Sequence, residues 1–202
     1  MSYENMDKET LIKVLKQKDD MLKALCLEKE KLTYYANTDT MTEVLNRRAG
    51  LELLERKLHL SKTCGESFVV CFVDVDRLKL VNDTFGHEEG DKLLVNAAKI
   101  IRGSIRETDL VIRMGGDEFL IVFHRSTMKE ANKLWYRISK NVEELNKNND
   151  KYDLSLSCGF CEYRKEMNKE ISINDLIKKA DMEMYKRKMT KRRNFRDMCL
   201  IK

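Results

Sequence analysis

The stretch Arg113-Met114-Gly115-Gly116-Asp117-Glu118-Phe119, near the middle of the chain, decides the fold. It separates two runs of β-branched, aromatic and other large apolar residues, at positions 110–114 and 119–123. Two glycines between such runs predict a tight β-hairpin, because glycine adopts positive φ without steric cost. Asp117 and Glu118 are therefore expected at the tip of the hairpin.

The hairpin tip has two interpretations. Glycines such as Gly115 and Gly116 let a ligand approach the backbone closely, and neighbouring carboxylates can hold a hard divalent cation. The turn would then bind phosphate and metal. The alternative is a surface hairpin with a solvated acidic tip, and the residues of the turn alone favour neither interpretation.

Composition limits the size and class of the protein. Its 202 residues, 42% of them hydrophobic, suffice for one core of roughly 150 residues and a short appendage. The formal net charge of +5 is too mild to indicate binding to nucleic acid. No apolar stretch approaches the roughly 20 residues that cross a bilayer, and the N-terminus lacks a signal-peptide pattern. We therefore expect a cytoplasmic protein that binds neither nucleic acid nor membrane.

The six cysteines are scattered and are expected to be free thiols. Cys158 and Cys161 form a C-x-x-C motif, but they lie in an expected strand. Positions three apart in a strand point to opposite faces. We therefore expect no redox or metal function for this pair.

The N-terminal segment, residues 1–37, is expected to be a helix that precedes a domain of residues 38–202. From Leu11 to Tyr35 apolar residues recur at alternating spacings of three and four, interrupted by Lys18 and Glu28. This pattern is that of an imperfect coiled-coil seam of about three and a half heptads. A single amphipathic helix packed on its own domain would produce a similar pattern.

A second acidic position follows an apolar run. Residues 67–73 are typical of a central strand buried on both faces, and the run ends at Asp74. A carboxylate there is costly unless it is paired or bound to metal, so Asp74 is a candidate metal ligand. The alternative is an aspartate that caps the following turn.

Apolar periodicity predicts the remaining elements. Asn46 is expected to cap a helix whose apolar face includes Leu51, Leu54 and Leu58. Further elements are a long helix over 128–145, a strand over 154–160 and a capped helix over 172–188. The last helix runs into a basic cluster at 186–193, which is typical of a solvated or nucleic-acid-binding tail.

Several of these stretches resemble the GGDEF family of diguanylate cyclases, whose signature is the sequence at 115–119. Residues 39–48 (DTMTEVLNRR) are similar to its motif DxLTGLxNRR, with Met41, Glu43 and Val44 as departures. Residues 72–91 resemble FxDxDxxKxxNDxxGHxxGD, with Leu78 where Phe is usual. Residues 180–188 match the terminal helix, after which Lys191 replaces a usual Gly and Arg193 a usual Asn.

The resemblance covers about residues 38–200 and implies a fold. We expect an α+β, palm-like domain with a ferredoxin-like core, in which helices flank a central, mostly antiparallel sheet. An N-terminal coiled-coil helix would precede it. The sheet would bring Asp74 beside the hairpin although Asp117 is 43 positions away.

The resemblance also implies an active site. One or two Mg²⁺ ions, or Mn²⁺, would be held by Asp74, the carbonyl of Val75, Asp117 and Glu118. The implied catalytic residues are Asp117, Glu118 and Lys79. Substrate would be bound by Asn82 and Asp91, which read guanine, by Gly115 and Gly116, and by Lys188 and Arg192, which hold triphosphate.

Arg106 and Asp109 are spaced as in the inhibitory product site of the family. There the arginine grips the product through two parallel hydrogen bonds. The alternative is a surface ion pair between residues three apart.

The implied reaction condenses two GTP into cyclic di-GMP and two pyrophosphates. Because each subunit binds one GTP, the active species would be a homodimer, with cyclic di-GMP as inhibitor and a partner sensor acting through the N-terminal helix. Two other classes stay open: a catalytically inactive module that binds GTP or cyclic di-GMP, and a basic coiled-coil protein that binds nucleic acid. The intact acidic and basic residues argue against the first, and salt-sensitive duplex binding would mark the second.

Overall fold

The computed structural model describes residues 6–164, 166 and 170–199, with side chains described as far as Lys191. The chain divides after Thr38 into two units, and each is considered by itself. The first contains α1 (Lys8–Asn37). The second contains β1 (Leu45–Asn46), α2 (Arg47–Cys64), β2 (Phe68–Val75), α3 (Leu78–Phe85), α4 (His87–Ser104), β3 (Leu110–Gly115), β4 (Glu118–His124), α5 (Met128–Lys147), β5 (Leu156–Tyr163) and α6 (Ile173–Cys199).

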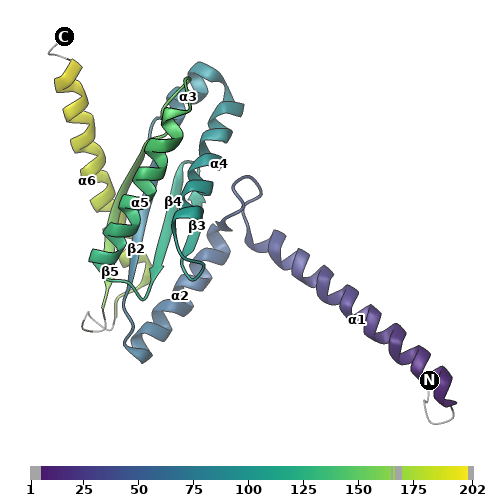
Figure 1. The fold of residues 1–202 in the computed structure, drawn as a ribbon. Helices are drawn as coiled ribbons and strands as arrows, with labels where there is room; N and C mark the ends of the chain where they lie inside the picture. The colour runs from purple at the N-terminus through teal and green to yellow at the C-terminus, as the bar shows by residue number, and fades with distance from the viewer. Residues whose placement is uncertain (1–5, 165, 167–169, 200–202) are drawn as a thin grey trace. The chain divides into compact units, whose positions relative to one another are not determined.

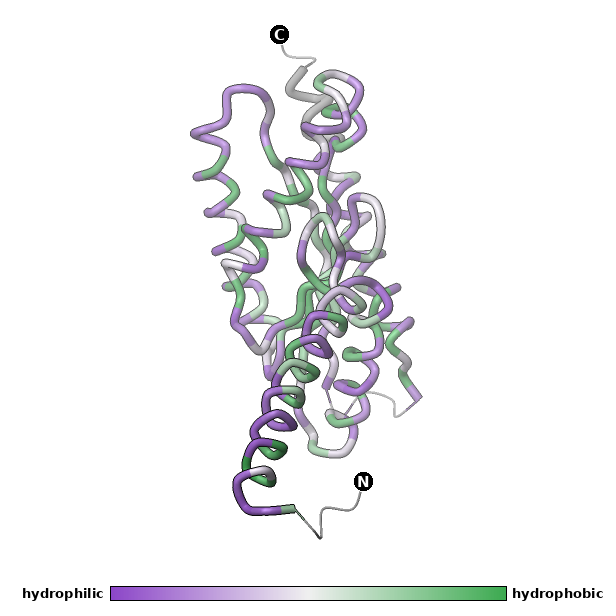
Figure 2. Tube along the Cα trace, turned by 90° about the vertical axis from the view of Figure 1, so that its right-hand side faces the viewer, coloured by the Kyte–Doolittle hydropathy of each residue, from purple (hydrophilic) through white to green (hydrophobic). Residues whose placement is uncertain are grey.

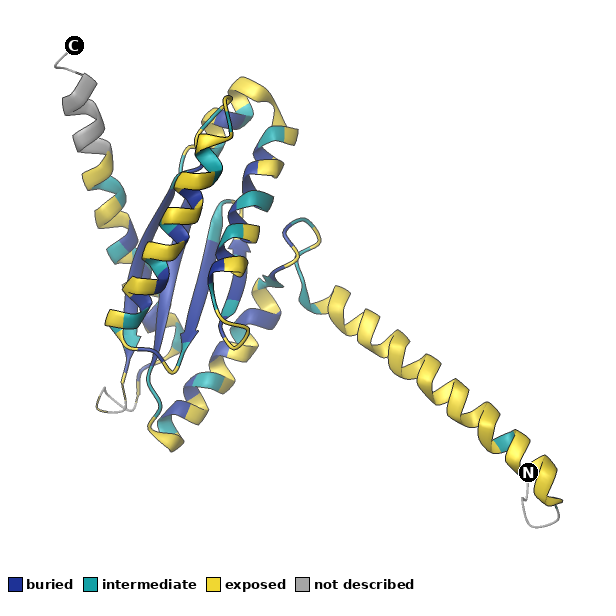
Figure 3. Cartoon of the chain, viewed as in Figure 1, coloured by how far each residue is buried: buried dark blue, intermediate teal, exposed yellow. Residues whose placement is uncertain are grey.

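Helix α1 begins after Asp7, whose carboxylate caps it by accepting a hydrogen bond from the Thr10 N–H at 2.9 Å. None of its residues is buried (Figure 3). Several positions of the expected seam are exposed, among them Met21, Leu25 and Leu32. No helix among residues 6–164 and 170–199 is long and apolar enough to span a membrane.

The second unit is built on a five-stranded sheet with the order β1-β3-β4-β2-β5 (Figure 1). Strand β1 pairs in parallel with β3, and every other neighbouring pair is antiparallel. The expected α+β fold with a mostly antiparallel sheet is confirmed. The Gly-Gly hairpin joins β3 and β4, as its glycines predict.

Helices cover both faces of the sheet. Alternate residues of β2 point to opposite sides, so Val69, Cys71 and Val73 join the core beneath α4 and α5. Phe68, Val70 and Phe72 join the core beneath α2 and α6. All eight residues of β2 are buried, which confirms a central strand covered on both faces (Figure 3). Along the helices, hydrophilic residues alternate with hydrophobic ones (Figure 2).

The two faces also separate the C-x-x-C motif. Cys158 lies in the core beneath α4 and α5, and Cys161 lies in the core beneath α2 and α6. This arrangement confirms that the two thiols do not face each other.

Local sequence signals predicted these helices and strands correctly, except for two element boundaries. Asn46 caps α2 by accepting from the Ala49 N–H at 3.0 Å, as expected. The strand expected over 154–160 lies over 156–163, because the Asn146 side chain donates to the Leu154 carbonyl and accepts from its N–H. The helix expected to end at Lys188 continues to Cys199.

Helix α6 lies unusually close to β5 at Gly159. A Cβ atom at this position would lie 2.0 Å from the Met184 nitrogen and 2.2 Å from the Ala180 oxygen, both in the α6 backbone. Any side chain would therefore push the helix away from the strand. The absence of a Cβ at Gly159 sets how closely α6 approaches the sheet.

Candidate active site

The end of β2 and the glycine hairpin meet at one edge of the sheet. Asp74 is paired in register with Glu118, the first residue of β4. The next residue, Val75, donates its N–H to the Asp117 carbonyl at 2.9 Å. The structure thus brings together the four residues that the sequence proposed as metal ligands.

The hairpin turn depends on its two glycines. Gly115 and Gly116 have φ values of 149° and 52°, in the region that side chains rarely adopt. A Cβ at either position would meet open space, so backbone conformation and not crowding requires glycine. The backbone of the turn is consequently accessible to a ligand.

Arg113 fixes this turn to the start of the domain. Its guanidinium donates to the Gly116 carbonyl at 3.0 Å and to the Asp39 carboxylate at 2.9 Å. The same Asp39 oxygen accepts from the Thr42 N–H and hydroxyl. Arg113 therefore contacts a residue 74 positions away in the chain, which no local sequence signal indicates.

Negative charge is concentrated around Asp74. Burial raises the pKa of its carboxyl, the Lys188 ammonium lowers it in part, and the neighbouring Asp117 and Asp76 carboxylates raise it further. The Nζ atom of Lys188 lies 2.5 Å from the Asp74 Oδ1 atom, and both side chains are largely buried. Lys188, assigned to triphosphate by resemblance, here contacts one of the proposed metal ligands.

Glu118 has a similar environment. Burial raises the pKa of its carboxyl, and repulsion from Asp117, Asp181 and Asp74 raises it further. Charge crowded in this way favours a bound cation, which stabilises the ionised carboxylates.

The residues fit a divalent metal by their chemistry. Among the described residues, no group of three or more His, Cys, Asp or Glu side chains is arranged as a ready metal site. The available donors are nonetheless carboxylate and carbonyl oxygens, which Mg²⁺ and Mn²⁺ prefer. Asp74, Val75, Asp117 and Glu118 would hold such an ion.

The proposed guanine readers lie on two adjoining helices. Asn82 is in α3 and Asp91 is in α4, where Gly90 lets the helices approach so closely that a Cβ would lie 1.8 Å from the Asn82 Oδ1 atom. This oxygen is buried and has no hydrogen-bond partner among the described residues. Lys79 and Asp91 are exposed. The Asn82 oxygen is thus an acceptor to which a ligand could donate.

The Arg106 and Asp109 pair differs from a surface ion pair. Asp109 is buried, and its two carboxylate oxygens accept from the backbone N–H groups of Arg106 and His124, at 3.0 Å and 2.8 Å. Burial raises the pKa of Asp109, and the nearby Arg106, Arg137 and Lys57 lower it in part. Asp109 therefore fixes a turn of the backbone, and the Arg106 side chain is exposed.

Arg137 is a further cation near this turn that the sequence analysis missed. It lies on α5, and its Nε atom donates to the Ser104 carbonyl at 2.6 Å. Its spacing of 28 positions from Asp109 gave no local signal.

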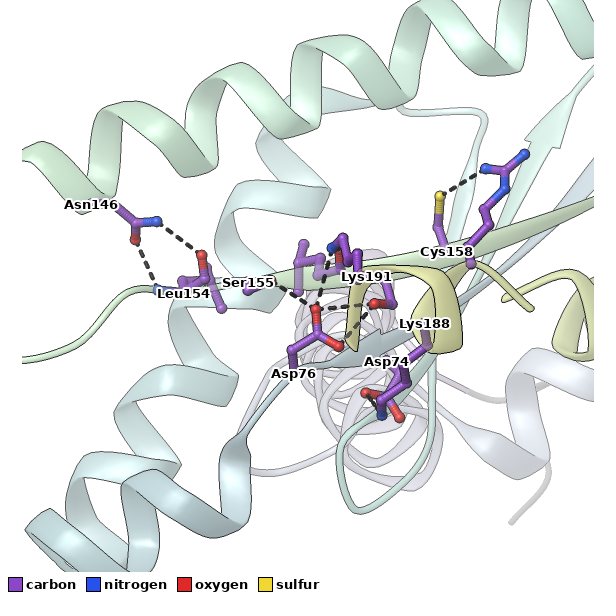
Figure 4. A network of polar contacts seen from close by, with 11 residues as sticks. Asp74, Asp76, Asn146, Leu154, Ser155, Cys158, Lys188 and Lys191 are labelled. Atoms are coloured by element: carbon purple, nitrogen blue, oxygen red, sulfur yellow. Dashed lines mark hydrogen bonds and ion pairs between the residues drawn. The ribbon is translucent and has the colours of Figure 1, made fainter. Parts of the chain in front are cut away.

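A second network surrounds Asp76, directly after β2 (Figure 4). The hydroxyls of Ser155 and Ser157 donate to its carboxylate at 2.7 Å and 2.8 Å. The Lys191 ammonium lies 3.3 Å from the same group and donates to the Leu156 carbonyl at 2.7 Å. The side chain of Arg192, the other residue assigned to triphosphate, lies outside the described residues.

The fold and the acidic edge of the sheet define a palm-like α+β domain with a polar site beside a glycine hairpin. Comparison with protein families makes the assignment specific. The family model described as the GGDEF domain of diguanylate cyclases matches residues 36–194, so the chain belongs to the GGDEF family.

Two relatives carry names that match this family. The chain is 34% identical over 154 residues to the probable diguanylate cyclase DgcJ of Escherichia coli, covering 76% of this chain and 30% of DgcJ. It is 30% identical over 176 residues to diguanylate cyclase A of Treponema denticola, covering 85% of this chain and 47% of that protein. The chain thus spans less than half the length of these two relatives.

Solved structures support the fold. The GGDEF domain of TpbB from Pseudomonas aeruginosa matches with a TM-score of 0.67 and 32% identity, covering 76% of this chain and 89% of that one. The coiled coil and GGDEF domain of DgcB from Caulobacter crescentus match with a TM-score of 0.77, covering 90% and 95% of the two chains. At 24% identity, the likeness to DgcB concerns the fold alone.

Proposed function

We propose that this protein is a diguanylate cyclase that joins two GTP molecules into cyclic di-GMP and releases two pyrophosphates. The observation that carries the proposal is the convergence of Asp74, Val75 and Asp117 at the end of β2, with Lys188 against Asp74. Family membership supports the same reaction. Each 3′-oxygen would attack the α-phosphate of the other nucleotide, and pyrophosphate would leave.

The carboxylates at this edge would hold one or two divalent cations. Asp74, Asp117, Glu118 and the Val75 carbonyl offer the oxygen ligands that Mg²⁺ or Mn²⁺ needs. When bound, the metal would neutralise charge on the phosphates and lower the pKa of the attacking 3′-hydroxyl. The raised pKa values of Asp74 and Glu118 support this role, since a cation would stabilise the ionised carboxylates against the burial and the repulsion that raise these values.

The other site residues would act on the substrate directly. Asp117 would accept the proton of the 3′-hydroxyl, with Glu118 beside it. Lys79 would stabilise charge on the transferred phosphoryl group and on leaving pyrophosphate. Lys188, together with Arg192, would hold the triphosphate, and the accessible backbone of Gly115 and Gly116 would allow its close approach.

Asn82 and Asp91 would select guanine. The Asp91 carboxylate would accept from the N1–H and N2–H₂ groups of guanine, donors that adenine lacks at that edge. The unpartnered oxygen of Asn82 supports a ligand at this position.

Two copies of the chain would form the active species. Each would contribute one GTP, and α1 would hold them together through its exposed apolar residues. A partner sensor would act through the same helix. The five described free cysteines suit a reducing compartment, so we place the protein in the cytoplasm.

Cyclic di-GMP would inhibit the enzyme at the turn that contains Arg106 and Asp109. The exposed Arg106 guanidinium would bind the product, and Arg137 lies near enough to Asp109 to lower its pKa. Asp109 accepts one backbone N–H at each oxygen, and each oxygen has a further lone pair for a ligand.

Incubation of the purified chain with GTP and Mg²⁺, with the products resolved by chromatography, tests the proposal. We expect cyclic di-GMP and pyrophosphate from the wild type, and no product from folded Asp74→Ala or Asp117→Ala variants. Glu144→Ala is the control, because the Glu144 side chain lies on the surface of α5, where it pairs with the exposed Lys147. A wild type that binds GTP or cyclic di-GMP without turnover would instead be a binding module.

A further inference from the structure

Lys191 occupies an unexpected place beside the candidate site. Glycine is usual at this position in the GGDEF family, and glycine ends helices readily. In this chain Lys191 lies inside α6, which continues to Cys199. The helix therefore adds a lysine three positions after Lys188, where the family pattern has no side chain.

The two lysines lie on the same face of α6 and reach the same end of β2 (Figure 4). Residues three apart on a helix have Cβ atoms roughly 5–6 Å apart. The Lys188 ammonium contacts Asp74, and the Lys191 ammonium contacts Asp76, two positions further on. Both lysines also line a cavity of ≈ 880 Å³ bounded by residues of α5, α6 and the start of β5.

Lys191 is held more loosely than Lys188. The Lys188 pair is 2.5 Å long, with side chains 18% and 10% exposed. The Lys191 pair is 3.3 Å long, and the lysine side chain is 55% exposed. Such an exposed ion pair contributes little to stability.

Asp76 does not depend on Lys191 for its hydrogen bonds. Ser155 and Ser157 already donate to its carboxylate. An ammonium group has three donors, and Lys191 uses two of them, toward Asp76 and the Leu156 carbonyl. The lysine can therefore turn toward an additional anion without leaving a buried charge unpaired.

From these contacts we infer that Lys191 is an additional triphosphate-binding residue, which supplies a second flexible cation next to Lys188. The inference rests on the proposed function, because it needs GTP bound at the end of β2. The ligand class is a nucleoside triphosphate, whose β- and γ-phosphates carry the charge that an ammonium attracts. A monophosphate lacks these groups and would not use Lys191.

Equilibrium binding of two guanine nucleotides to the full chain in Mg²⁺ tests the inference. The probes are GMP and 3′-deoxy-GTP, which lacks the attacking hydroxyl and is not turned over. Lys191→Gln should weaken 3′-deoxy-GTP binding by about tenfold and leave GMP binding unchanged. Lys191→Arg should keep most of the triphosphate affinity. Lys186→Gln is the matched control, since Lys186 pairs with Glu183 on the exposed surface of the same helix.

Two outcomes would overturn the inference. Equal losses for both nucleotides in Lys191→Gln would mean that Lys191 only fastens α6 to β5. Unchanged binding of both would mean that the lysine does not reach the phosphates. Failure of the proposed function is distinguishable, because the wild type would then form no cyclic di-GMP from GTP, whatever the effect of Lys191→Gln on nucleotide binding.

Discussion

Substitution of Gly159 by alanine should separate α6 from the sheet. The added Cβ would lie 2.0 Å from the Met184 nitrogen, whereas ordinary contact begins at 3.4 Å. The backbone of α6 must therefore move outward by about 1.4 Å, the difference between these distances. Forcing extra atoms into a packed core costs about 1–3 kcal/mol. Because the obstacle is backbone and not a side chain that can rotate, we expect about 3 kcal/mol.

Thermal unfolding followed by far-UV circular dichroism measures this effect. A loss of about 3 kcal/mol should lower the Tm by roughly 6–12 °C in a domain of this size. The same movement would lengthen the 2.5 Å contact between Lys188 and Asp74, so nucleotide affinity should fall as well. Gly103→Ala is the control, because a Cβ there meets nothing within 4 Å and alanine favours the helix. An unchanged Tm in Gly159→Ala would refute the packing argument.

Three further predictions concern charge, product and assembly. Because burial and repulsion raise the folded-state pKa of Glu118, ionisation of its carboxyl destabilises the fold as pH rises from the unfolded-state pKa through the folded-state pKa. Glu118→Gln should therefore stabilise the fold at neutral pH and not below about pH 4, and a lower Tm than wild type at pH 7 would contradict this. Arg106→Ala should weaken inhibition by cyclic di-GMP roughly 10- to 150-fold, whereas identical inhibition curves would exclude Arg106 from the product site. Removing residues 1–36 should make specific activity rise steeply with protein concentration; equal activity per subunit in both forms at nanomolar concentration would exclude α1 as the tether.

The sequence predicted those parts of the fold whose signals are local. The unbroken apolar run at 67–73 predicted β2, and the glycine pair predicted the β3–β4 hairpin. Two boundaries were misplaced for physical reasons. The backbone of Leu154 bonds to the Asn146 side chain instead of the sheet, which hydropathy does not reveal. The end of α6 was set too early, although lysine and arginine are good helix formers and no glycine or proline interrupts the basic run.

In the candidate site, too, residues that follow a local sequence signal could be predicted, and long-range contacts could not. Asp74 and Asp117 each follow a strong strand or turn signal, so their meeting could be anticipated from the resemblance. The backbone role of Asp109 could not, because it depends on the His124 N–H from a different strand. The contact of Lys191 with Asp76 joins residues 115 positions apart. It could not be predicted, because it depends on how α6 is positioned along β5.

The bridge formed by Arg113 has a consequence for chimeric proteins. Asp39 lies two residues after Asn37, the last residue of α1, and through the Arg113 guanidinium it is connected to the carbonyl of Gly116. These two hydrogen bonds therefore attach the glycine turn to the first residue of the second unit. A fusion that replaces the chain up to Thr38 keeps both hydrogen bonds of Arg113. A fusion joined after Met41 removes Asp39, and the turn that carries Asp117 would then lose its hydrogen-bonded connection to the start of the domain.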